Sequence, residues 1–349
     1  MCGVVATCLL FCSVLSSCKP PLQKNSHKNK YSAHSFDYFD TAATITGYET
    51  TKEEFDAVAE DVFAKLSEYH KLYTIYHRFD GMENLCTVNE LVDGAHRTVT
   101  VDRRIVDMLL YAKQMYTATD GLLNVAMGSM LSLWHEYRAI GSDNPAEASL
   151  PPMELLAAAA AHADINKMVI DEANATVMLT DPLMKLDVGA IAKGYATECI
   201  ARYLEEKGIT GYMLNIGGNV RTVGSKPDGT PWVIGIENGN NKDEYLAYLQ
   251  LSGQSVVTSG SYQRYYTVDG KRYHHIIHPE TYMPAEGFLS VSVICEDSGL
   301  GDALSTALFC MPLEKGKALV EAMPNVEVMW VRENGEQTFS SGWNAYIKQ

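Results

Sequence analysis

The chain has 349 residues, of which 46% are hydrophobic and 20% are charged, and its formal net charge is −15. This composition is typical of a globular protein with enough apolar residues to bury a core. Because so acidic a protein repels the phosphates of nucleic acid, the charge argues against a nonspecific nucleic-acid-binding protein.

The N-terminus carries an apolar run that is typical of a secretory signal. Residues 4–17 are too few to span a bilayer comfortably. Leu15-Ser-Ser-Cys18 then matches the bacterial lipobox, in which the cysteine receives a lipid. We therefore predict a lipoprotein signal peptide at 1–17, lipidation of Cys18 and attachment to the extracytoplasmic face of a bacterial cell membrane. An ordinary cleaved signal or an N-terminal anchor is the alternative.

A polar segment follows, and we predict that residues 18–35 form a tether between the membrane and a domain at 36–349. The segment is rich in lysine and contains two adjacent prolines, a composition typical of linkers. Its lysines would lie favourably against anionic lipid headgroups. The cysteines beyond it are scattered without CxxC spacing, which indicates neither a zinc site nor a disulfide framework.

The first half of the domain predicts a strand and then helices. Residues 36–48 read as one strand, and Thr51-x-x-Glu54 is a capping box for the helix that follows. Apolar residues at helical spacing predict helices at 51–73, 102–117 and 151–162.

The second half predicts many short strands interrupted by helices. Strands are expected near Met168, Val177 and Leu186 and at 212–216, 232–237, 245–251, 256–259, 272–277, 290–294 and 326–331. Helices are expected after Asp187 and at 301–311 and 314–322. Because the strands and helices do not alternate regularly, the sequence predicts an α+β fold. No linker interrupts it, so we expect a single compound domain.

The segment after Asp187 is the strongest candidate for a binding site. A strand-like run ends at Asp187, and apolar periodicity predicts that a helix begins at once. A helix N-terminus presents free N–H groups and partial positive charge, and Lys193 would add its charge about one and a half turns later. The pattern favours a phosphate site. The alternative is a capped core helix with a solvated lysine.

A second candidate lies on the helix predicted at 301–311. Asp302 and Thr306 are four residues apart and therefore share a face, with Ser305 beside them. A carboxylate with hydroxyls is a hard-oxygen set that suits Mg²⁺. Alternatively, Asp302 is an N-terminal helix charge and Thr306 bonds back to its own helix.

A cluster of histidines forms the third candidate. His274, His275 and His278 fall within five residues, and strand alternation would place His274 and His278 on one face. Zinc would need a third ligand that the neighbourhood does not offer. A single histidine acting as a general base is the better interpretation, because its ordinary pKa lies near neutrality.

Taken in chain order, these pieces resemble the FAD:protein FMN transferase family, the ApbE-like flavin transferases. The resemblance runs from about Phe36 to Trp330. It rests on Thr119-Asp-Gly-Leu-Leu-Asn124 ahead of Met127-Gly128, Leu186-Asp-Val-Gly-Ala-Ile-Ala-Lys-Gly-Tyr195, Asn215-Ile-Gly-Gly218, Thr258-Ser-Gly-Ser-Tyr262, His274-His-Ile-Ile277 and Asp302-Ala-Leu-Ser-Thr306.

The resemblance implies an ApbE-like, T-fold-like domain of intertwined antiparallel sheets and helices. It implies an enzyme, a flavinyltransferase, that uses Mg²⁺ to cleave FAD at its pyrophosphate. FMN passes to a threonine or serine hydroxyl of an acceptor protein, and AMP leaves. The implied partners are FAD, the acceptor and, through the lipid, the membrane.

The resemblance also implies roles for individual positions. The Mg²⁺ ligands would be Asp302, Ser305, Thr306 and the backbone carbonyl of Ala190. The general base on the acceptor hydroxyl would be His275. The FAD pocket would be lined by Tyr76, Leu122, Leu123, Asn124, Asp187, Lys193 and Ile276.

Two positions depart from the family pattern, and other functions remain open. His278 stands where the family usually has Asp before proline, and Tyr282 stands where many members have Gly. The same site could act as a Mg²⁺-dependent FAD pyrophosphatase with water as the acceptor. A non-catalytic flavin-binding lipoprotein and a zinc protein that uses the histidines are the more distant alternatives.

Overall fold

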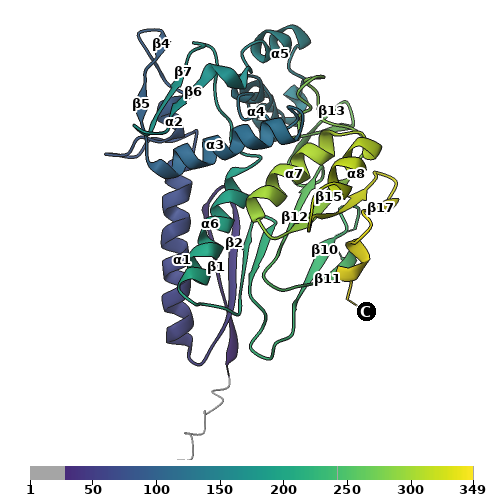
Figure 1. The fold of residues 1–349 in the computed structure, drawn as a ribbon. Helices are drawn as coiled ribbons and strands as arrows, with labels where there is room; N and C mark the ends of the chain where they lie inside the picture. The colour runs from purple at the N-terminus through teal and green to yellow at the C-terminus, as the bar shows by residue number, and fades with distance from the viewer. Residues whose placement is uncertain (1–27, 242, 349) are drawn as a thin grey trace, which may run out of the picture.

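The computed structural model describes residues 28–241 and 243–348 (Figure 1). The predicted signal peptide, Cys18 and most of the predicted tether lie outside the described residues. Within those residues, none of the helices combines the length and the hydropathy that a bilayer span needs.

An eight-stranded antiparallel sheet forms the centre of the molecule. Its strand order is β1-β2-β8-β9-β12-β15-β16-β17. The strands are β1 (Asn29–Tyr38), β2 (Thr41–Glu49), β8 (Tyr212–Ile216), β9 (Asn219–Val223), β12 (Ser255–Gly260), β15 (Ser290–Cys295), β16 (Glu327–Val331) and β17 (Gln337–Phe339).

Both faces of this sheet are covered. One face packs on α1 (Lys52–Tyr73), α6 (Ala192–Glu206), α7 (Ser298–Cys310) and α8 (Leu313–Glu321). The other face packs on the hairpin of β10 (Trp232–Glu237) and β11 (Tyr245–Leu251) and on the short helix Trp343–Tyr346. All six residues of β15 are therefore buried, as expected for a strand that is covered on both sides.

Smaller elements form a second layer at one end of the large sheet, at the top of Figure 1. The elements are α2 (Leu85–Val88), β3 (Leu91–Val92), β4 (Ala95–His96), β5 (Val99–Thr100), α3 (Arg103–Ala118), α4 (Gly128–Asp143), α5 (Met153–Ala160), β6 (Met168–Asp171), β7 (Thr176–Leu179), β13 (Tyr265–Val268) and β14 (Lys271–His274). The apolar cluster around α2, α3, β5, β6 and β7 includes residues of α6 and α7, so this part of the layer is continuous with the helices on the large sheet. The elements α4, α5, β13 and β14 pack around a separate cluster.

The α+β class is confirmed, and so are the elements with strong local signals. Thr51 and Glu54 form the predicted capping box at the start of α1. Asp102 caps α3, which ends where Asp120 and Gly121 adopt positive φ angles of 54° and 83°. Both residues therefore stop the helix by turning the chain into the left-handed region.

The prediction for the start of the domain was wrong in one respect. Residues 29–35, assigned to the tether, lie in β1, and the single strand predicted at 36–48 is a hairpin of β1 and β2. Phe39 and Asp40 reverse the chain with φ angles of 54° and 50°. The polar composition masked an alternation in which Tyr31 and Ala33 pack on the apolar core beneath α1.

Two further predictions need correction, and two elements were missed. The helix after Asp187 does not begin at once, because a turn precedes α6 and its first residue is Ala192. The strand expected near Leu186 is a single isolated bridge between Met127 and Lys185. Neither α4 nor β9 was predicted, and each contributes residues to the cavity described below.

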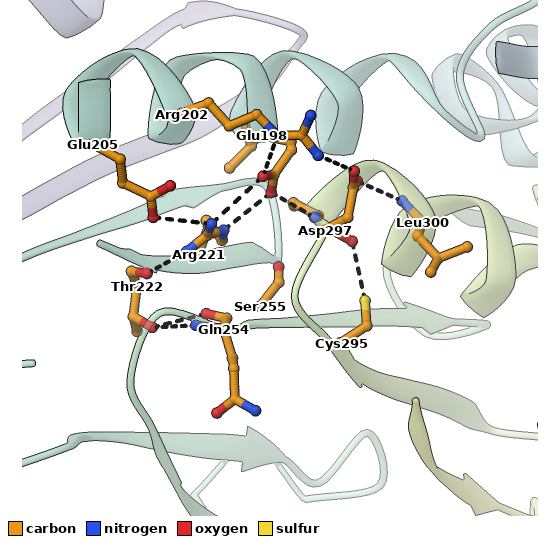
Figure 2. Close-up of polar contacts among 12 residues, drawn as sticks. Glu198, Arg202, Glu205, Arg221, Thr222, Gln254, Ser255, Cys295, Asp297 and Leu300 are labelled. Carbon is orange, nitrogen blue, oxygen red and sulfur yellow. Dashed lines mark hydrogen bonds and ion pairs between the residues drawn. The ribbon is translucent and has the colours of Figure 1, made fainter. Parts of the chain in front are cut away.

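A buried ion-pair network fixes α6, β9 and the start of α7 to one another (Figure 2). The carboxylate of Glu198 accepts from Arg221 Nε at 3.0 Å, Arg202 Nε at 2.9 Å and the backbone N–H of Ser298 at 2.9 Å. Glu198 and Arg221 are 5% and 4% exposed. Burial alone would raise the pKa of Glu198, but the bonds and charge of Arg221, together with the bonds from Ser298 and Arg202, outweigh burial and hold that pKa below its usual value.

Candidate active site

A cavity of about 400 Å³ opens between the large sheet and the second layer. Its wall is built from segments far apart in the chain: the turn after β1, the loop after α3, α4, the turn before α6, the turn between β8 and β9, the end of β12, the segment after β14, and α7. The predicted site residues that line it are Tyr76, Leu122, Leu123, Asn124, Asp187, Ala190, Lys193, His275, Ile276, Asp302 and Thr306.

Ser305 is the predicted metal ligand that does not line the cavity. It is fully buried, and its hydroxyl donates to the carbonyl of Asp302 at 3.0 Å. Ser259 Oγ lies 2.8 Å from Ser305 Oγ and 3.3 Å from Thr306 Oγ1. Ser259 does line the cavity, so it connects the buried hydroxyl of Ser305 to the cavity wall.

Asp302 is the most buried carboxylate of the cavity, with 4% exposure. Its Oδ2 accepts from the backbone N–H of Gly194 at 2.8 Å and lies 3.5 Å from Lys193 Nζ. Burial raises the pKa of Asp302, and the Lys193 ammonium and the Gly194 N–H partly offset this. Asp302 is therefore not the helix cap, a position that Asp297 occupies.

Gly194 allows this arrangement because α6 and α7 approach closely there. A Cβ at position 194 would lie 2.3 Å from the carbonyl oxygen of Ser298 and 2.4 Å from Asp302 Cβ. No side chain fits into that space without separating the helices. Glu198 lies one turn after Gly194 on α6, and its carboxylate accepts from the N–H of Ser298 on α7. This bond therefore also holds α6 and α7 close together.

Hard oxygen atoms gather around Asp302, and this is the set that Mg²⁺ prefers. Asn219 contributes a buried amide oxygen that has no hydrogen-bond partner among the described residues. That orphaned acceptor, the carboxylate of Asp302 and the hydroxyl of Thr306 all belong to the cavity wall and fit a hard cation. In the described ranges, no three His, Cys, Asp or Glu side chains come together as a metal site.

The turn before α6 places Asp187 against α4. Asp187 Oδ1 accepts from the N–H of Gly189 at 2.9 Å, and Oδ2 lies 3.8 Å from His135 Nε2. His135 Nδ1 in turn lies 3.2 Å from the hydroxyl of Tyr76. Lys193 Nζ donates to the carbonyl of Gly189 at 3.2 Å, so its ammonium stays at the cavity.

His275 is half-buried in the cavity wall. Its Nδ1 lies 3.2 Å from the carbonyl oxygen of Arg264, so this nitrogen carries the proton and donates it. Nε2 is then the unprotonated nitrogen of the neutral ring. Burial and the positive charges of Arg264 and Arg138 lower the pKa of His275 to about 3. A histidine with this pKa is unprotonated near neutral pH, as a general base must be, but so low a pKa also makes it a weak base.

The apolar part of the wall comes from the loop after α3 and from Ile276. The side chain of Leu123 is fully buried, and the amide of Asn124 is bonded at both ends, to the carbonyl of Ala163 and to the N–H of Ala126. These two positions therefore offer the cavity mainly backbone groups.

The two departures from the family pattern lie in one turn. His278 Nδ1 accepts from the N–H of Glu280 at 3.1 Å, which is the bond that an Asp side chain makes in such turns. Tyr282 has a φ of 63°, in the left-handed region that favours glycine. Neither residue lines the cavity of 400 Å³.

Sequence reasoning missed several residues of the wall. Ser259 falls within the motif Thr258-Ser-Gly-Ser-Tyr262, and Asn219 directly follows the motif that ends at Gly218, but neither residue was assigned a role. His135 and Arg138 lie on α4, which was not predicted, and Arg264 lies in a loop; all three line the cavity. The spacing of His135 and Arg138, three residues apart, would place both on one face once the helix is recognised.

Known proteins resemble this chain over nearly its whole length. The model of the ApbE family matches residues 39–330. The FAD:protein FMN transferase of Klebsiella pneumoniae is 33% identical over 288 residues, 82% of this chain and 85% of that protein. The FAD:protein FMN transferase of Haemophilus influenzae is 28% identical over 345 residues, 97% of this chain and 95% of that protein.

A solved structure supports the same relationship. The crystal structure of the ApbE protein of Thermotoga maritima superposes with a TM-score of 0.80 at 29% identity. The match covers 92% of this chain and all of the other.

Proposed function

Because this chain belongs to the ApbE family, we propose that it is an enzyme that transfers FMN from FAD to an acceptor protein. The observation that carries the proposal is the composition of one cavity wall. A neutral histidine, a buried carboxylate with hydroxyls, and an apolar wall are brought together from distant parts of the chain. Transfer of FMN needs three groups close together. These are a general base, ligands for a cation and an apolar surface that binds the flavin ring.

We propose further that the acceptor group is a threonine or serine hydroxyl and that AMP is the leaving group. A hydroxyl is a weak nucleophile, so it needs a base within hydrogen-bond reach. His275 fits that role, because the carbonyl of Arg264 fixes the tautomer in which Nε2 is free to accept a proton.

The residues around Asp302 fit Mg²⁺ as the cofactor. Asp302, Thr306 and the carbonyl of Ala190 would hold the ion at the cavity wall, and the orphaned oxygen of Asn219 supports a cation there. Ser305 lies behind this wall and is bonded to Ser259, so it would support the ion indirectly, through Ser259. Bound Mg²⁺ would neutralise the pyrophosphate and the charge that develops on departing AMP.

The other predicted residues would bind and orient FAD. Lys193 offers its ammonium, and Asp187 offers a carboxylate oxygen that is 3.8 Å from His135. Leu122 and Ile276 offer apolar surface that excludes water from the reacting groups. Water as the acceptor would make the same site an FAD pyrophosphatase, and a site that binds without turnover would make the protein a flavin carrier.

We propose that the enzyme works at the extracytoplasmic face of a bacterial cell membrane, held by a lipid on Cys18. The support is the apolar run followed by Leu15-Ser-Ser-Cys18 in the sequence. Treatment of cells with a labelled fatty acid should label the wild-type chain and leave a Cys18→Ser variant unlabelled.

The central test is a transfer assay with the full chain in detergent. The protein is incubated with FAD, Mg²⁺ and the unmodified form of a protein that carries FMN on threonine. We expect mass spectrometry to show one FMN added to the acceptor and one AMP released for each adduct. AMP and free FMN without an adduct would favour the pyrophosphatase, whereas retained FAD without turnover would exclude both enzymes.

The His275→Ala variant tests the base. Because a positioned base contributes roughly 10²–10⁴-fold, we expect the single-turnover transfer rate to fall by that factor while FAD affinity changes little. Flavin fluorescence gives the affinity, and quenched-flow sampling gives the rate. Equal losses in rate and affinity would show that His275 serves binding instead.

The pH profile of the wild type gives a second test of His275 as the base. The charges that face His275 are Arg264, Arg138, His274 and Lys193, and burial together with these charges lowers its pKa from 6.5 to about 3. The base therefore stays unprotonated as the pH falls through 6.5, so we expect kcat/KM to show no loss centred there. A loss centred at 6.5 that disappears in His275→Ala would contradict the depressed pKa.

A further inference from the structure

The charged residues of the cavity leave two arginines without carboxylate partners. The cations that line it are Arg138, Lys193 and Arg264. Lys193 lies 3.5 Å from Asp302, and Asp187 lies beside His135. Throughout residues 28–241 and 243–348, no carboxylate lies within ion-pair distance of Arg138 or Arg264, although the chain carries a net charge of −15.

Arg138 reaches the cavity from α4 and is half-buried there. Burial and the nearby charge of Arg264 lower the pKa of Arg138 below its ordinary value, but an arginine pKa is so high that the guanidinium stays charged near neutral pH. A desolvated cation without a partner costs folding free energy, and a bound anion would recover that cost. The arrangement therefore indicates an anionic ligand.

Arg264 is held next to the proposed base. Its carbonyl accepts from the backbone N–H of His275 at 3.1 Å, and its guanidinium donates to the carbonyl of Asp40 at 3.2 Å. Arg264 is exposed, so the cost of an unpaired buried cation applies to Arg138 alone. Both arginines nevertheless line the same cavity as His275, where the acceptor hydroxyl must lose its proton.

We propose that Arg138 and Arg264 bind the phosphate of the FMN half of FAD, the phosphoryl group that is transferred. This assignment rests on the proposed function. The acceptor oxygen forms a bond to that phosphorus as the bond to the bridging pyrophosphate oxygen breaks. The hydroxyl proton goes to His275 Nε2, and AMP leaves with the bridging oxygen and the bonding electrons. Two planar guanidinium groups match the phosphate oxygens in shape and charge.

The test compares FMN with riboflavin, which lacks the phosphate, as ligands of the full chain in Mg²⁺ buffer. Flavin fluorescence titration gives both affinities for the wild type, Arg138→Met, Arg264→Met and Arg138→Lys. A hydrogen bond to a charged group is worth about 10- to 100-fold in affinity. We expect each Met variant to lose FMN affinity by about that factor and to keep the riboflavin affinity, while Arg138→Lys recovers part of the loss.

The matched control is Arg272→Met, because Arg272 is an exposed arginine on β14 that does not line the cavity. Its FMN-to-riboflavin ratio should equal that of the wild type. An unchanged ratio in both cavity variants would overturn the proposal. So would a raised KM for the acceptor at an unchanged ratio, since the arginines would then serve the acceptor protein.

The ratio of FMN affinity to riboflavin affinity can be measured without turnover. The assignment of the two arginines and the proposed transferase activity can therefore be refuted independently. A wild type that prefers FMN through Arg138 but forms no adduct would refute the transferase and leave the phosphate site in place. Adduct formation by the wild type, together with an unchanged ratio in the Met variants, would refute the arginine pair alone.

Discussion

Asp302→Ala is expected to abolish FMN transfer, with a loss of at least about 10³-fold in kcat. Asp302 is the one carboxylate in the proposed Mg²⁺ set, and a bound metal supplies several kcal/mol of charge stabilisation in the transition state. The substitution also leaves the Gly194 N–H and the Lys193 ammonium without the oxygen that they now contact at 2.8 and 3.5 Å.

The measurement is the rate of adduct formation as a function of Mg²⁺ concentration. Asp302→Asn keeps the shape and an acceptor for the Gly194 N–H but removes the charge, so it should be nearly as inactive as Asp302→Ala. Asp56→Ala removes an exposed carboxylate of α1 that pairs with Lys52, and it should leave the rate unchanged. Full activity of Asp302→Asn at the Mg²⁺ concentration that saturates the wild type would refute the metal assignment.

Arg221→Met is expected to have the largest effect on stability, a loss of about 3–5 kcal/mol in the free energy of unfolding. Arg221 is 4% exposed and bonds both Glu198 and Glu205. Without it, the carboxylate of Glu198 stays buried with its main partner removed. Urea unfolding at neutral pH, followed by circular dichroism, gives the free energy.

A double variant and the pH dependence distinguish the cost of an unpaired buried Glu198 carboxylate from a simple loss of packing. Glu198→Met combined with Arg221→Met removes both charges, so it should be more stable than Arg221→Met alone. In the wild type the lowered pKa of Glu198 contributes stability above 4.5 that is lost as the pH falls through the folded pKa. In Arg221→Met that contribution is gone, so the stability deficit relative to the wild type should shrink as the pH falls below 4.5 and through the folded pKa of Glu198. A deficit that is constant with pH, and equal in the double variant, would point to packing.

Elements with strong local signals could be predicted from the sequence. The capping box of Thr51 and Glu54 marks the start of α1 through bonds between residues close in the sequence. Asp102 marks the start of α3 in the same way. β1 could not be predicted in this way, because its polar residues form a strand only when paired with β2 and packed on α1. Its conformation depends on contacts that the local sequence does not display.

The residues of the candidate site also differ in whether the local sequence predicts them. Asp187 and Asp302 could be predicted because they lie in local patterns, a strand-to-helix junction and a pair four residues apart on a helix. The contact between Asp302 and Gly194, in contrast, joins residues 108 positions apart. Arg138 belongs to no motif that the sequence displays. Arg138 reaches the cavity because α4 packs on α5 and β13, and the bond from Trp134 Nε1 to the carbonyl of Tyr282, at 2.9 Å, helps to fix the helix there.

The strand β1 also acts as a spacer of fixed length. It runs for ten residues from Asn29 to Tyr38, and the turn after it contributes Asp40 and Thr41 to the cavity wall. A strand rises about 3.3 Å per residue, so roughly 30 Å of pleated backbone separates the chain before Asn29 from the cavity. The strand therefore sets a fixed length of chain between the residues that precede Asn29 and the two residues that the turn after β1 places in the cavity wall.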